Sequence, residues 1–303
     1  MICHVCKKLD VRRLRIEKAV QIYECLDCQL GFVEQNVSSL TRSYKDDTNG
    51  FYDFEGYREK ENKLKKRFGS LIEEIIKYKK SGNVLDVGAG FGLFSSILTK
   101  NGKYQIDILE PNVERFYLRF ISYNFYKTTL AKFLTLTKLR DRGDLSIKRQ
   151  GKLYDVIILM DVIEHLENPL VNLKKLKLLL APGGILIIQT PNYKSLMARI
   201  CKDWAWWMIE DHKFFFSPKS LQKILYKAGF KSEYFMTYED WYDFKKNLDG
   251  NFTGIKNNPL KKLIKGLFFS LFFPFYFLFR KMIWRLGYGG LMFVIAKKDW
   301  RLH

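Results

Sequence analysis

Residues 83–92 read Asn-Val-Leu-Asp-Val-Gly-Ala-Gly-Phe-Gly, a short apolar strand that runs into a glycine-rich turn. The apolar spacing after the turn is helical, so the segment predicts a strand–turn–helix unit of an α/β fold. Glycine suits such a turn because the backbone passes close to a ligand and can take positive φ there. Nicotinamide and flavin proteins use similar turns, so the glycines alone do not identify the ligand.

Two carboxylates narrow the choice of ligand. Asp86 stands directly before the glycines, where negative charge would not suit a pyrophosphate, so it favours a cationic cofactor. Glu110 ends the next predicted strand, residues 104–109, at about 20 residues beyond the glycines. A carboxylate in that place can accept hydrogen bonds from both hydroxyls of a ribose. The pattern therefore predicts a cationic cofactor that carries a ribose.

With these residues the chain resembles the class I S-adenosylmethionine-dependent methyltransferases. In that family the glycine-rich loop holds the methionine part of the cofactor, and the acid that closes the second strand holds the ribose. The resemblance implies a Rossmann-like α/β fold with a seven-stranded sheet, and S-adenosylmethionine as the cofactor. The cofactor-binding residues that it implies are Asp86, Gly88, Ala89, Gly90, Phe91, Glu110, Pro111 and Asp161.

Later segments continue the resemblance in the order of the family. Residues 154–169 resemble the family's fourth strand and the loop after it, and residues 178–192 resemble a helix, a Pro-Gly-Gly turn and the fifth strand. Residues 216–238 resemble the helix before the sixth strand and that strand itself, and residues 289–296 resemble the last strand. An acid that contacts adenine usually follows the third strand of the family, and here Asp141 and Asp144 are both candidates.

Four of the five cysteines form two Cys-x-x-Cys pairs within the first 28 residues. The residues between the pairs can form a β-hairpin that brings them together, which is typical of a zinc ribbon. Four thiolates around one tetrahedral ion leave no open position, so the predicted role is structural. A redox motif would be followed by a βαβ unit, whereas short strands are predicted at residues 21–25 and 30–33. The predicted zinc ligands are Cys3, Cys6, Cys25 and Cys28, with His4 and Cys201 as bystanders.

These features predict three consecutive parts. Residues 1–35 form the zinc ribbon, residues 36–57 a polar linker or flap, and residues 58–303 the methyltransferase domain, which begins with an amphipathic helix. Residues 257–287 form an apolar, basic-flanked insertion between the sixth and seventh strands. Nothing before the cysteines resembles a signal segment, so we expect a cytoplasmic, reducing setting.

Two of the four histidines lie where a general base could act. His165 follows Asp161 on the side of the sheet where ligands bind in such folds. His212 follows a tryptophan-rich stretch, residues 204–216, where the family places substrate-covering insertions. Methyl transfer by direct displacement depends mainly on alignment in a dry pocket, but a hydroxyl acceptor would benefit from a base. Position alone favours structural roles for both, with His165 as a helix cap or a residue packed against the cofactor loop, and His212 as a hydrogen-bonded residue. The aromatic stretch is either packed core or a set of rings that stack on a sugar, a base or a lipid headgroup.

A phenylalanine-rich run of 14 uncharged residues, 266–279, lies between basic clusters near the C-terminus. A helix needs about 20 apolar residues to cross a bilayer, so the run is expected to be too short, and Pro274 interrupts it. Basic residues beside an aromatic-rich apolar helix are typical of an interfacial segment, so residues 261–285 are predicted to bind an anionic membrane surface. The alternative is a pair of helices packed against the domain or a partner.

The formal charge of +20 attracts any polyanion and does not distinguish nucleic acid from an acidic membrane. We expect methyl transfer to a small molecule, which would be a glycan precursor, sugar nucleotide or lipid-linked intermediate at the cytoplasmic membrane surface. One alternative is RNA methylation, because a zinc ribbon before such a domain also resembles one type of ribosomal RNA methyltransferase. Another is a non-catalytic protein that senses cofactor or binds a partner. Nucleic acid is disfavoured because the nine basic residues of 261–303, against one acidic residue, lie mostly beside apolar sequence.

Overall fold

A computed structural model of the chain describes residues 1–18, 20–34, 54–111, 124–136, 152–201, 203–239, 244–245, 247–248 and 258–299. The chain divides into two compact units. The ribbon unit comprises residues 1–38, 189–223 and 234–294, and the cofactor unit comprises residues 39–188, 224–233 and 295–303. The two acids considered for adenine, Asp141 and Asp144, and most of the predicted linker lie outside the described residues.

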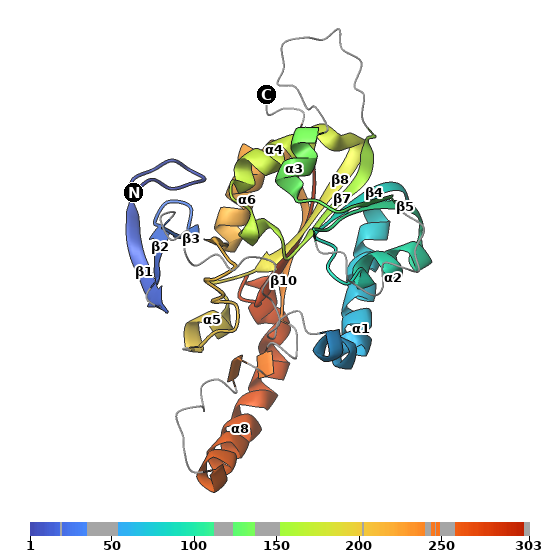
Figure 1. Cartoon of the computed structure of the whole chain (residues 1–303). Coiled ribbons are helices and arrows are strands. Elements are labelled where there is room, and N and C mark those ends of the chain that lie inside the picture. The colour runs from blue at the N-terminus through green and yellow to red at the C-terminus, as the bar shows by residue number, and fades with distance from the viewer. Residues whose placement is uncertain are drawn as a thin grey trace. The chain divides into compact units, whose positions relative to one another are not determined.

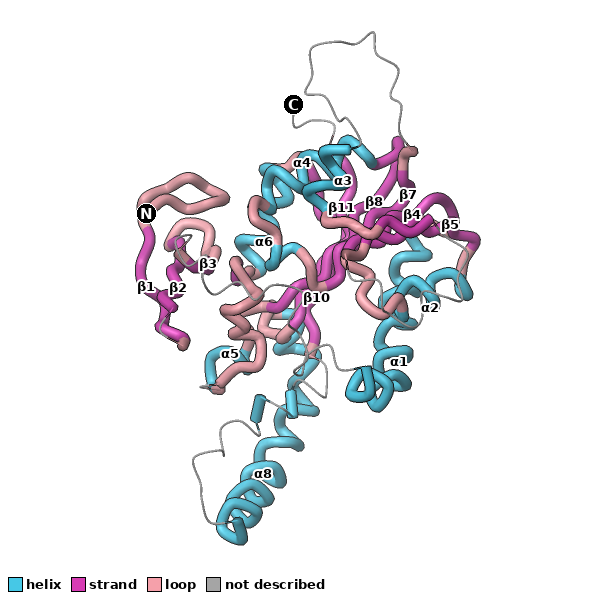
Figure 2. The backbone as a smooth tube through the Cα atoms, viewed as in Figure 1, coloured by secondary structure: helices cyan, strands magenta, loops and turns pink. Residues whose placement is uncertain are grey.

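A seven-stranded sheet carries the glycine-rich turn. Its strands, in spatial order, are β10 (Phe230–Tyr238), β11 (Leu291–Lys298), β8 (Leu180–Pro191), β7 (Tyr154–Met160), β4 (Ser81–Val87), β5 (Lys103–Leu109) and β6 (Asn124–Tyr126). β4 pairs in parallel with β5 and with β7, and β5 pairs in parallel with β6. Figure 2 shows the strands of this sheet in magenta. The predicted Rossmann-like methyltransferase fold is confirmed.

Two pairs of helices pack in the cofactor unit. α1 (Phe54–Tyr78) packs on α2 (Leu93–Asn101), and α3 (Leu130–Leu136) packs on α4 (Pro169–Leu179). Figure 1 shows the two pairs on opposite sides of β4 and β5. α1 is the predicted amphipathic helix, because Phe68, Leu71, Ile72 and Ile75 are buried at helical spacing.

A second sheet of four strands belongs to the ribbon unit. Its order is β1 (Val11–Glu17), β2 (Val20–Cys25), β3 (Gly31–Val33) and β9 (Phe214–Phe215). β1 and β2 form the antiparallel hairpin that was predicted between the two cysteine pairs. β3 pairs with β2 on one edge and with β9 on the other. The sheet therefore joins the N-terminal strands to a segment that follows β8, and the sequence did not predict this pairing.

Short elements surround β9 in the chain. α5 (Leu196–Ile200) follows β8 and is capped by Ser195, whose hydroxyl accepts a hydrogen bond from the N–H of Ala198 at 3.1 Å. α6 (Pro218–Lys227) then leads to β10 as predicted. Asn192 anchors the start of this region, because its side-chain amide donates to the carbonyls of Gly287 and Gly289 at 2.9 Å each.

The apolar insertion is one helix, α8 (Asn258–Arg285), of 28 residues, and not a pair. It continues through Pro274, so the predicted interruption is wrong. Proline removes one N–H donor, and the carbonyl left without it belongs to Ser270, which is exposed and can bind water. By length and composition the segment Pro259–Arg285 is a candidate to cross a membrane, because its most apolar 18-residue window has a mean hydropathy of 1.5. The uncharged run of 14 residues is shorter than α8, because the basic residues on both sides of the run belong to the same helix.

Candidate functional site

The turn between β4 and α2 takes a backbone shape that favours glycine. Gly88, Gly90 and Gly92 have φ of 68°, 56° and 75°. A Cβ at Gly88 would lie 2.7 Å from Cγ2 of Val162, and the Gly88 N–H donates to the carbonyl of Leu109 at 2.7 Å. The turn is thus held against the ends of β5 and β7, the edge of an open α/β sheet where ligands bind. At this edge Phe91 is buried, whereas Ala89 and Pro111 are half-buried.

Asp86 is a buried carboxylate at the end of β4. It accepts a hydrogen bond from the hydroxyl of Ser95 at 2.5 Å and is 2% exposed. Burial, with the negative charge of Glu110 as a further cause, raises the pKa of Asp86 to about 6, although the Ser95 hydrogen bond opposes the shift. A bound cation stabilises the ionised form of such a carboxylate, because the positive charge compensates for the water that burial removes from it.

Glu110 directly follows β5 and lies beside the turn. Its Oε2 accepts a hydrogen bond from the N–H of Gly90 at 3.0 Å, and the residue is 4% exposed. The structure therefore brings together the glycine-rich turn and the acid predicted to hold a ribose. A buried carboxylate in this place can accept hydroxyl donors.

Asp161 and His165 lie just beyond β7. Asp161 has φ of 54°, which is uncommon for a residue other than glycine and often marks a functional site. His165 ends the short 3-10 helix η2 (Ile163–His165), and its N–H donates to the carbonyl of Val162 at 3.0 Å. His165 is half-buried there. Its place in a short helix fits the structural alternative, and its catalytic role remains a prediction.

These residues fit S-adenosylmethionine as a group. The positive-φ glycines bring backbone close to a ligand, Asp86 suits a positive charge, and Glu110 suits ribose hydroxyls. The assignment of each residue to a part of the cofactor remains a prediction.

His212 lies in the ribbon unit and is buried, with 2% exposed. Its Nδ1 lies 3.1 Å from the carbonyl of Trp206, and its ring stacks on Trp206 with centroids 6.3 Å apart. A carbonyl can only accept, so Nδ1 carries the proton and Nε2 is the basic nitrogen of the neutral ring. The hydrogen bond at Nδ1 is compatible with both roles predicted for His212, a structural residue and a general base.

The aromatic stretch around His212 forms its own packed cluster. Trp207 contacts Trp204 and Phe215 with ring centroids 5.2 and 5.0 Å apart. The Nε1 atoms of Trp204 and Trp207 are buried, and neither has a hydrogen-bond partner within the described part of the chain. Buried N–H groups nearly always have a partner, which can be water or a ligand.

The four N-terminal cysteines converge. The Sγ atoms of Cys3 and Cys28 are 3.5 Å apart, and those of Cys6 and Cys25 are 3.4 Å apart. Zn–S bonds of about 2.3 Å place the sulfur atoms of a tetrahedral site about 3.8 Å apart, so the cluster has the size that zinc needs. The contact between Cys3 and Cys28 lowers the pKa of the Cys3 thiol and raises the pKa of the Cys28 thiol.

His4 and Cys201 lie in other surroundings. The His4 ring packs edge-on against Phe32 and Phe214, with centroids 5.1 and 5.2 Å away, as a bystander would. Burial lowers the pKa of His4, the neighbouring Cys3 opposing the shift. Cys201 is a buried, free thiol that follows α5. The group of four thiols in the N-terminal strands therefore matches the predicted ligand set.

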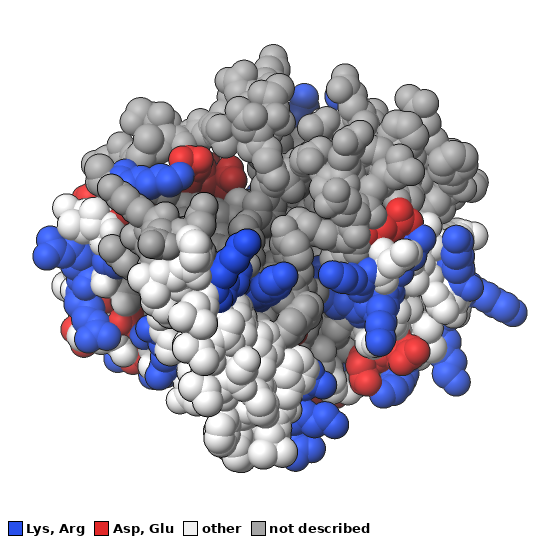
Figure 3. Space-filling model, turned by 90° about the horizontal axis from the view of Figure 1, so that it is seen from below, with Lys and Arg blue, Asp and Glu red and all other residues white. Residues whose placement is uncertain are grey.

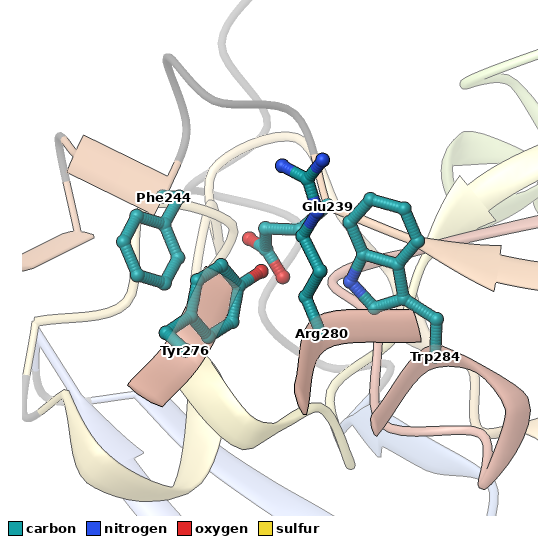
Figure 4. Close-up of a pocket in the computed structure, with 5 residues that line it drawn as sticks. All are labelled: Glu239, Phe244, Tyr276, Arg280 and Trp284. Atoms are coloured by element: carbon teal, nitrogen blue, oxygen red, sulfur yellow. The ribbon is translucent and has the colours of Figure 1, made fainter. Parts of the chain in front are cut away.

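A small pocket of about 40 Å³ lies beside the C-terminal half of α8 (Figure 4), lined by Glu239, Phe244, Tyr276, Arg280 and Trp284. Phe244 and Tyr276 stack with ring centroids 4.1 Å apart. Burial, followed by the negative charge of Glu239, raises the pKa of Tyr276. Figure 4 shows the Glu239 carboxylate near both the Tyr276 hydroxyl and the Arg280 guanidinium. These contacts fix α8 to the segment that follows β10.

Sequence comparison agrees with this site. A family model described as a methyltransferase domain matches residues 57–234, more than half of the chain, and the chain belongs to this family. A Rickettsia bellii protein named ubiquinone biosynthesis O-methyltransferase is 28% identical over 213 residues, which cover 64% of this chain and 84% of that protein. A Cereibacter sphaeroides protein of the same name is 30% identical over 158 residues, 48% of this chain and 59% of its own.

Structural comparison shows the same fold. A solved S-adenosylmethionine-dependent methyltransferase from Archaeoglobus fulgidus superposes with a TM-score of 0.50 at 20% identity, over 81% of this chain and 100% of that chain. The chain is a class I S-adenosylmethionine-dependent methyltransferase.

Sequence reasoning missed the partners of the ribbon. Buried Glu24 forms ion pairs with Arg12 and Lys194 and accepts a hydrogen bond from the Tyr193 hydroxyl at 2.9 Å. A glutamate at a buried position of a predicted strand is a signal that something must neutralise it. Its partners Tyr193 and Lys194 are too distant in the chain for a local pattern to reveal them.

Proposed function

We propose that this enzyme transfers a methyl group from S-adenosylmethionine to an oxygen atom of a small amphiphilic molecule. The observation that carries the proposal is the match to relatives named as O-methyltransferases, which in the Rickettsia bellii protein covers 84% of its length. A match of that extent includes sequence beyond the cofactor turn, and therefore parts of the chain that can contact an acceptor. Among the acceptors expected from the sequence, a lipid-linked intermediate fits best, because α8 gives the enzyme an apolar surface.

The cofactor is held by residues at the ends of β4, β5 and β7. When bound, it supplies an electrophilic methyl group on a positively charged sulfur. Asp86 stabilises the positive charge of the methionine part, and Glu110 accepts the ribose hydroxyls. The backbone of Gly88, Ala89, Gly90 and Phe91 passes close to the methionine part, while Pro111 and Asp161 border the adenosine. Methyl transfer then requires the acceptor oxygen to lie in line with the methyl group.

His212 is the proposed general base, with His165 as the second candidate. The Trp206 carbonyl holds the proton of His212 on Nδ1, which leaves Nε2 to take the proton of an acceptor hydroxyl. The buried Nε1–H groups of Trp204 and Trp207 are proposed to donate to acceptor oxygens or to ordered water.

The segment that holds His212 begins where β8 ends. This segment, residues 192–217, is called the post-β8 segment. Acceptors in open α/β folds bind beyond the carboxyl ends of the strands, and the segment starts at such an end. The placement supports an acceptor-side role for its aromatic residues.

The cysteine cluster is proposed to hold one structural zinc ion. The support is the 3.4–3.5 Å spacing of the sulfur pairs and the antiparallel hairpin of β1 and β2, which connects the turns that carry the two cysteine pairs. Elemental analysis of the purified full-length protein should find one zinc per chain, and a zinc content near zero in well-folded protein would contradict the proposal.

α8 is proposed to lie in one leaflet of an anionic membrane. Only 6% of its most apolar window is buried. Figure 3, seen from below, shows a patch of uncharged surface in the lower centre, with Lys and Arg beside it. The basic residues on the helix are Lys261, Lys262, Lys265, Arg280, Lys281 and Arg285. Apolar side chains would enter the acyl region, and the basic residues would contact anionic headgroups.

Topology favours one leaflet over a full span. The C-terminal end of α8 is tied to the end of β10, because the Thr237 hydroxyl donates to the carbonyl of Trp284 at 2.5 Å. A span would place Asn258 across the membrane from β10, and residues 240–257 would have to cross the hydrocarbon in the other direction. Those residues include six that are charged, and charge at the bilayer centre is costly.

The acceptor class is tested by methyl transfer from labelled S-adenosylmethionine to three substrates in parallel. We expect turnover of an alkylated catechol presented in anionic vesicles, and little turnover of a soluble sugar nucleotide or of ribosomal RNA. Preferred methylation of the sugar nucleotide would replace the lipid-linked acceptor, and preferred methylation of RNA would overturn the small-molecule proposal.

A further inference from the structure

The ribbon is completed by β9 of the post-β8 segment. Phe215 pairs with Gly31 and Phe214 pairs with Phe32, in antiparallel register. A Cβ at Gly31 would lie 2.9 Å from Cβ of Phe215, so the two strands approach as closely as a glycine permits. The His4 ring, within the first cysteine pair, packs on Phe214. β9 therefore contacts both the third ribbon strand and the first cysteine pair.

The second cysteine pair contacts both ends of the post-β8 segment. The carbonyl of Gln29, the residue after Cys28, accepts a hydrogen bond from the Ser217 hydroxyl at 3.0 Å. It also lies 2.9 Å from the Tyr193 hydroxyl, which shares its one proton between this carbonyl and the Glu24 carboxylate. Gln29 has φ of 57°, a left-handed conformation at the end of the knuckle. The carbonyl keeps its direction only while the knuckle keeps its shape, and the thiolate of Cys28 would be fixed by the metal.

A buried charge adds to this connection. Glu24, next to Cys25, is 1% exposed. Its carboxylate forms ion pairs with Lys194 and Arg12, and it accepts a hydrogen bond from the Tyr193 hydroxyl at 2.9 Å. Two of these three partners belong to the post-β8 segment. A buried carboxylate that loses its partners destabilises its surroundings strongly, so the ribbon and the segment stabilise each other.

The ribbon is too small to be stable alone. Residues 1–34 form three short strands, and a core of this size usually needs a metal or disulfides. A structural zinc ion supplies folding free energy to the strands that ligate it. The contacts of Gln29, Glu24 and β3 make the stability of the post-β8 segment depend on the folded ribbon. The segment belongs to the same compact unit as the ribbon and not to the unit that holds the cofactor turn.

We infer that zinc occupancy controls the folding of the post-β8 segment, and with it the acceptor side of the enzyme, while the cofactor turn folds without zinc. The inference rests on the proposed zinc site. In it Tyr193 and Ser217 are positioning residues, because they act through the ribbon on the region that holds His212 and the tryptophans. In this inference the role of the ribbon within the enzyme is to stabilise the post-β8 segment, in addition to any role in recruiting a partner.

Hydrogen exchange of the full-length protein tests the inference. Zinc-loaded protein is compared with protein from which a chelator has removed zinc. We expect amides of residues 204–217 to exchange at least about tenfold faster without zinc, because their opening free energy falls. Amides of residues 83–110 should exchange at the same rate in both samples, and the affinity for S-adenosylhomocysteine should change by less than about threefold.

A double variant, Tyr193→Phe with Ser217→Ala, separates the contacts from the metal. It keeps all four cysteines and the Tyr193 ring, but removes both hydroxyls that meet the Gln29 carbonyl and, with the Tyr193 hydroxyl, the hydrogen bond to Glu24. We expect one zinc per chain and faster exchange in residues 204–217. Tyr23→Phe is the matched control, because the Tyr23 hydroxyl donates to Gln21 within the ribbon. It should leave exchange of residues 204–217 unchanged.

The outcomes distinguish this inference from the zinc proposal. Absence of zinc from the purified chain would overturn both. A chain that holds removable zinc, but whose residues 204–217 stay protected after removal and in the double variant, would overturn the inference alone. Loss of S-adenosylhomocysteine binding on zinc removal would overturn the independence of the cofactor turn.

Discussion

Asp86 illustrates how burial prepares a residue for a charged ligand. Its raised pKa means that the folded protein binds more protons than the unfolded chain between about pH 4 and pH 6. The free energy of unfolding of the cofactor-free protein therefore falls as pH rises through that window. A cofactor cation bound beside Asp86 would reverse the effect, because it would stabilise the ionised carboxylate.

The pH dependence of cofactor affinity follows from this residue. We expect affinity for S-adenosylmethionine to be constant above about pH 7 and to fall about tenfold by pH 5, as Asp86 becomes protonated. Asp86→Asn should bind more weakly at pH 7.5 and show little change with pH. Calorimetric titration across the range measures both proteins, and an unchanged wild-type affinity at pH 5 would show that the ionised carboxylate is not needed.

The role of His212 can be separated from its structural contacts. Asn can donate to the Trp206 carbonyl in place of Nδ1, but it has no counterpart of Nε2. We therefore expect His212→Asn to lower kcat by about a hundredfold or more while S-adenosylhomocysteine affinity stays the same. His165→Asn is the parallel variant. If His212→Asn keeps nearly full turnover of the preferred acceptor, His212 is not the base.

At the scale of single elements, α8 presents a row of exposed apolar residues. Leu271, Phe275 and Leu278 are 69%, 65% and 74% exposed, at a spacing that puts them on one face. Replacing all three by serine should lower binding to anionic vesicles at least about tenfold, since each buried apolar side chain contributes about 1.5–3 kcal/mol. Val171→Ser with Ile200→Ser is the control, because these exposed residues lie on α4 and α5.

Vesicle sedimentation measures the effect, with folding checked by circular dichroism. Deletion of residues 262–286 should likewise move the protein from the membrane to the soluble fraction. Equal sedimentation of the triple-serine variant and the wild type would show that α8 packs against protein and not lipid.

Elements differ in how far their sequence predicts them. The β4 turn and Glu110 could be located because strand, turn and helix follow one another, so local composition contains the signal. The bounds of α8 agree with the insertion predicted at residues 257–287. The uncharged run of 14 residues is shorter than this helix, because a window that stops at the first lysine leaves out the charged turns of the same helix. The pairing of β3 with β9 could not be predicted, since two short aromatic strands far apart in the chain have many equivalent partners.

At the scale of the whole molecule, the charge of +20 makes RNA binding a poor indicator of function. We expect the protein to bind RNA at 50 mM salt and to lose about a thousandfold of that affinity by 200 mM, as counterion release dictates. No methyl group should enter the RNA at either concentration. Filter binding and label incorporation measure the two quantities, and salt-resistant incorporation into RNA would revive the RNA methyltransferase alternative.

The two units also differ in what sequence alone could reveal. The cofactor unit follows the family pattern, so its fold was predictable from motifs in order, and the structure brings the glycine-rich turn and Glu110 together as expected. The ribbon unit combines segments from three parts of the chain. Its cysteine spacing predicted that the four thiols converge, and they do. Its contacts with the post-β8 segment depend on tertiary packing, which local patterns do not specify.

The most direct test of the account is calorimetric titration of the zinc-loaded protein with S-adenosylhomocysteine, alongside Asp86→Ala, Glu110→Ala and the surface control Glu74→Ala. We predict micromolar affinity for the wild type and the control, and a loss of at least about tenfold in each of the two site variants. Failure of the folded wild type to bind, or unchanged affinity in both site variants, would contradict the assignment of the cofactor site.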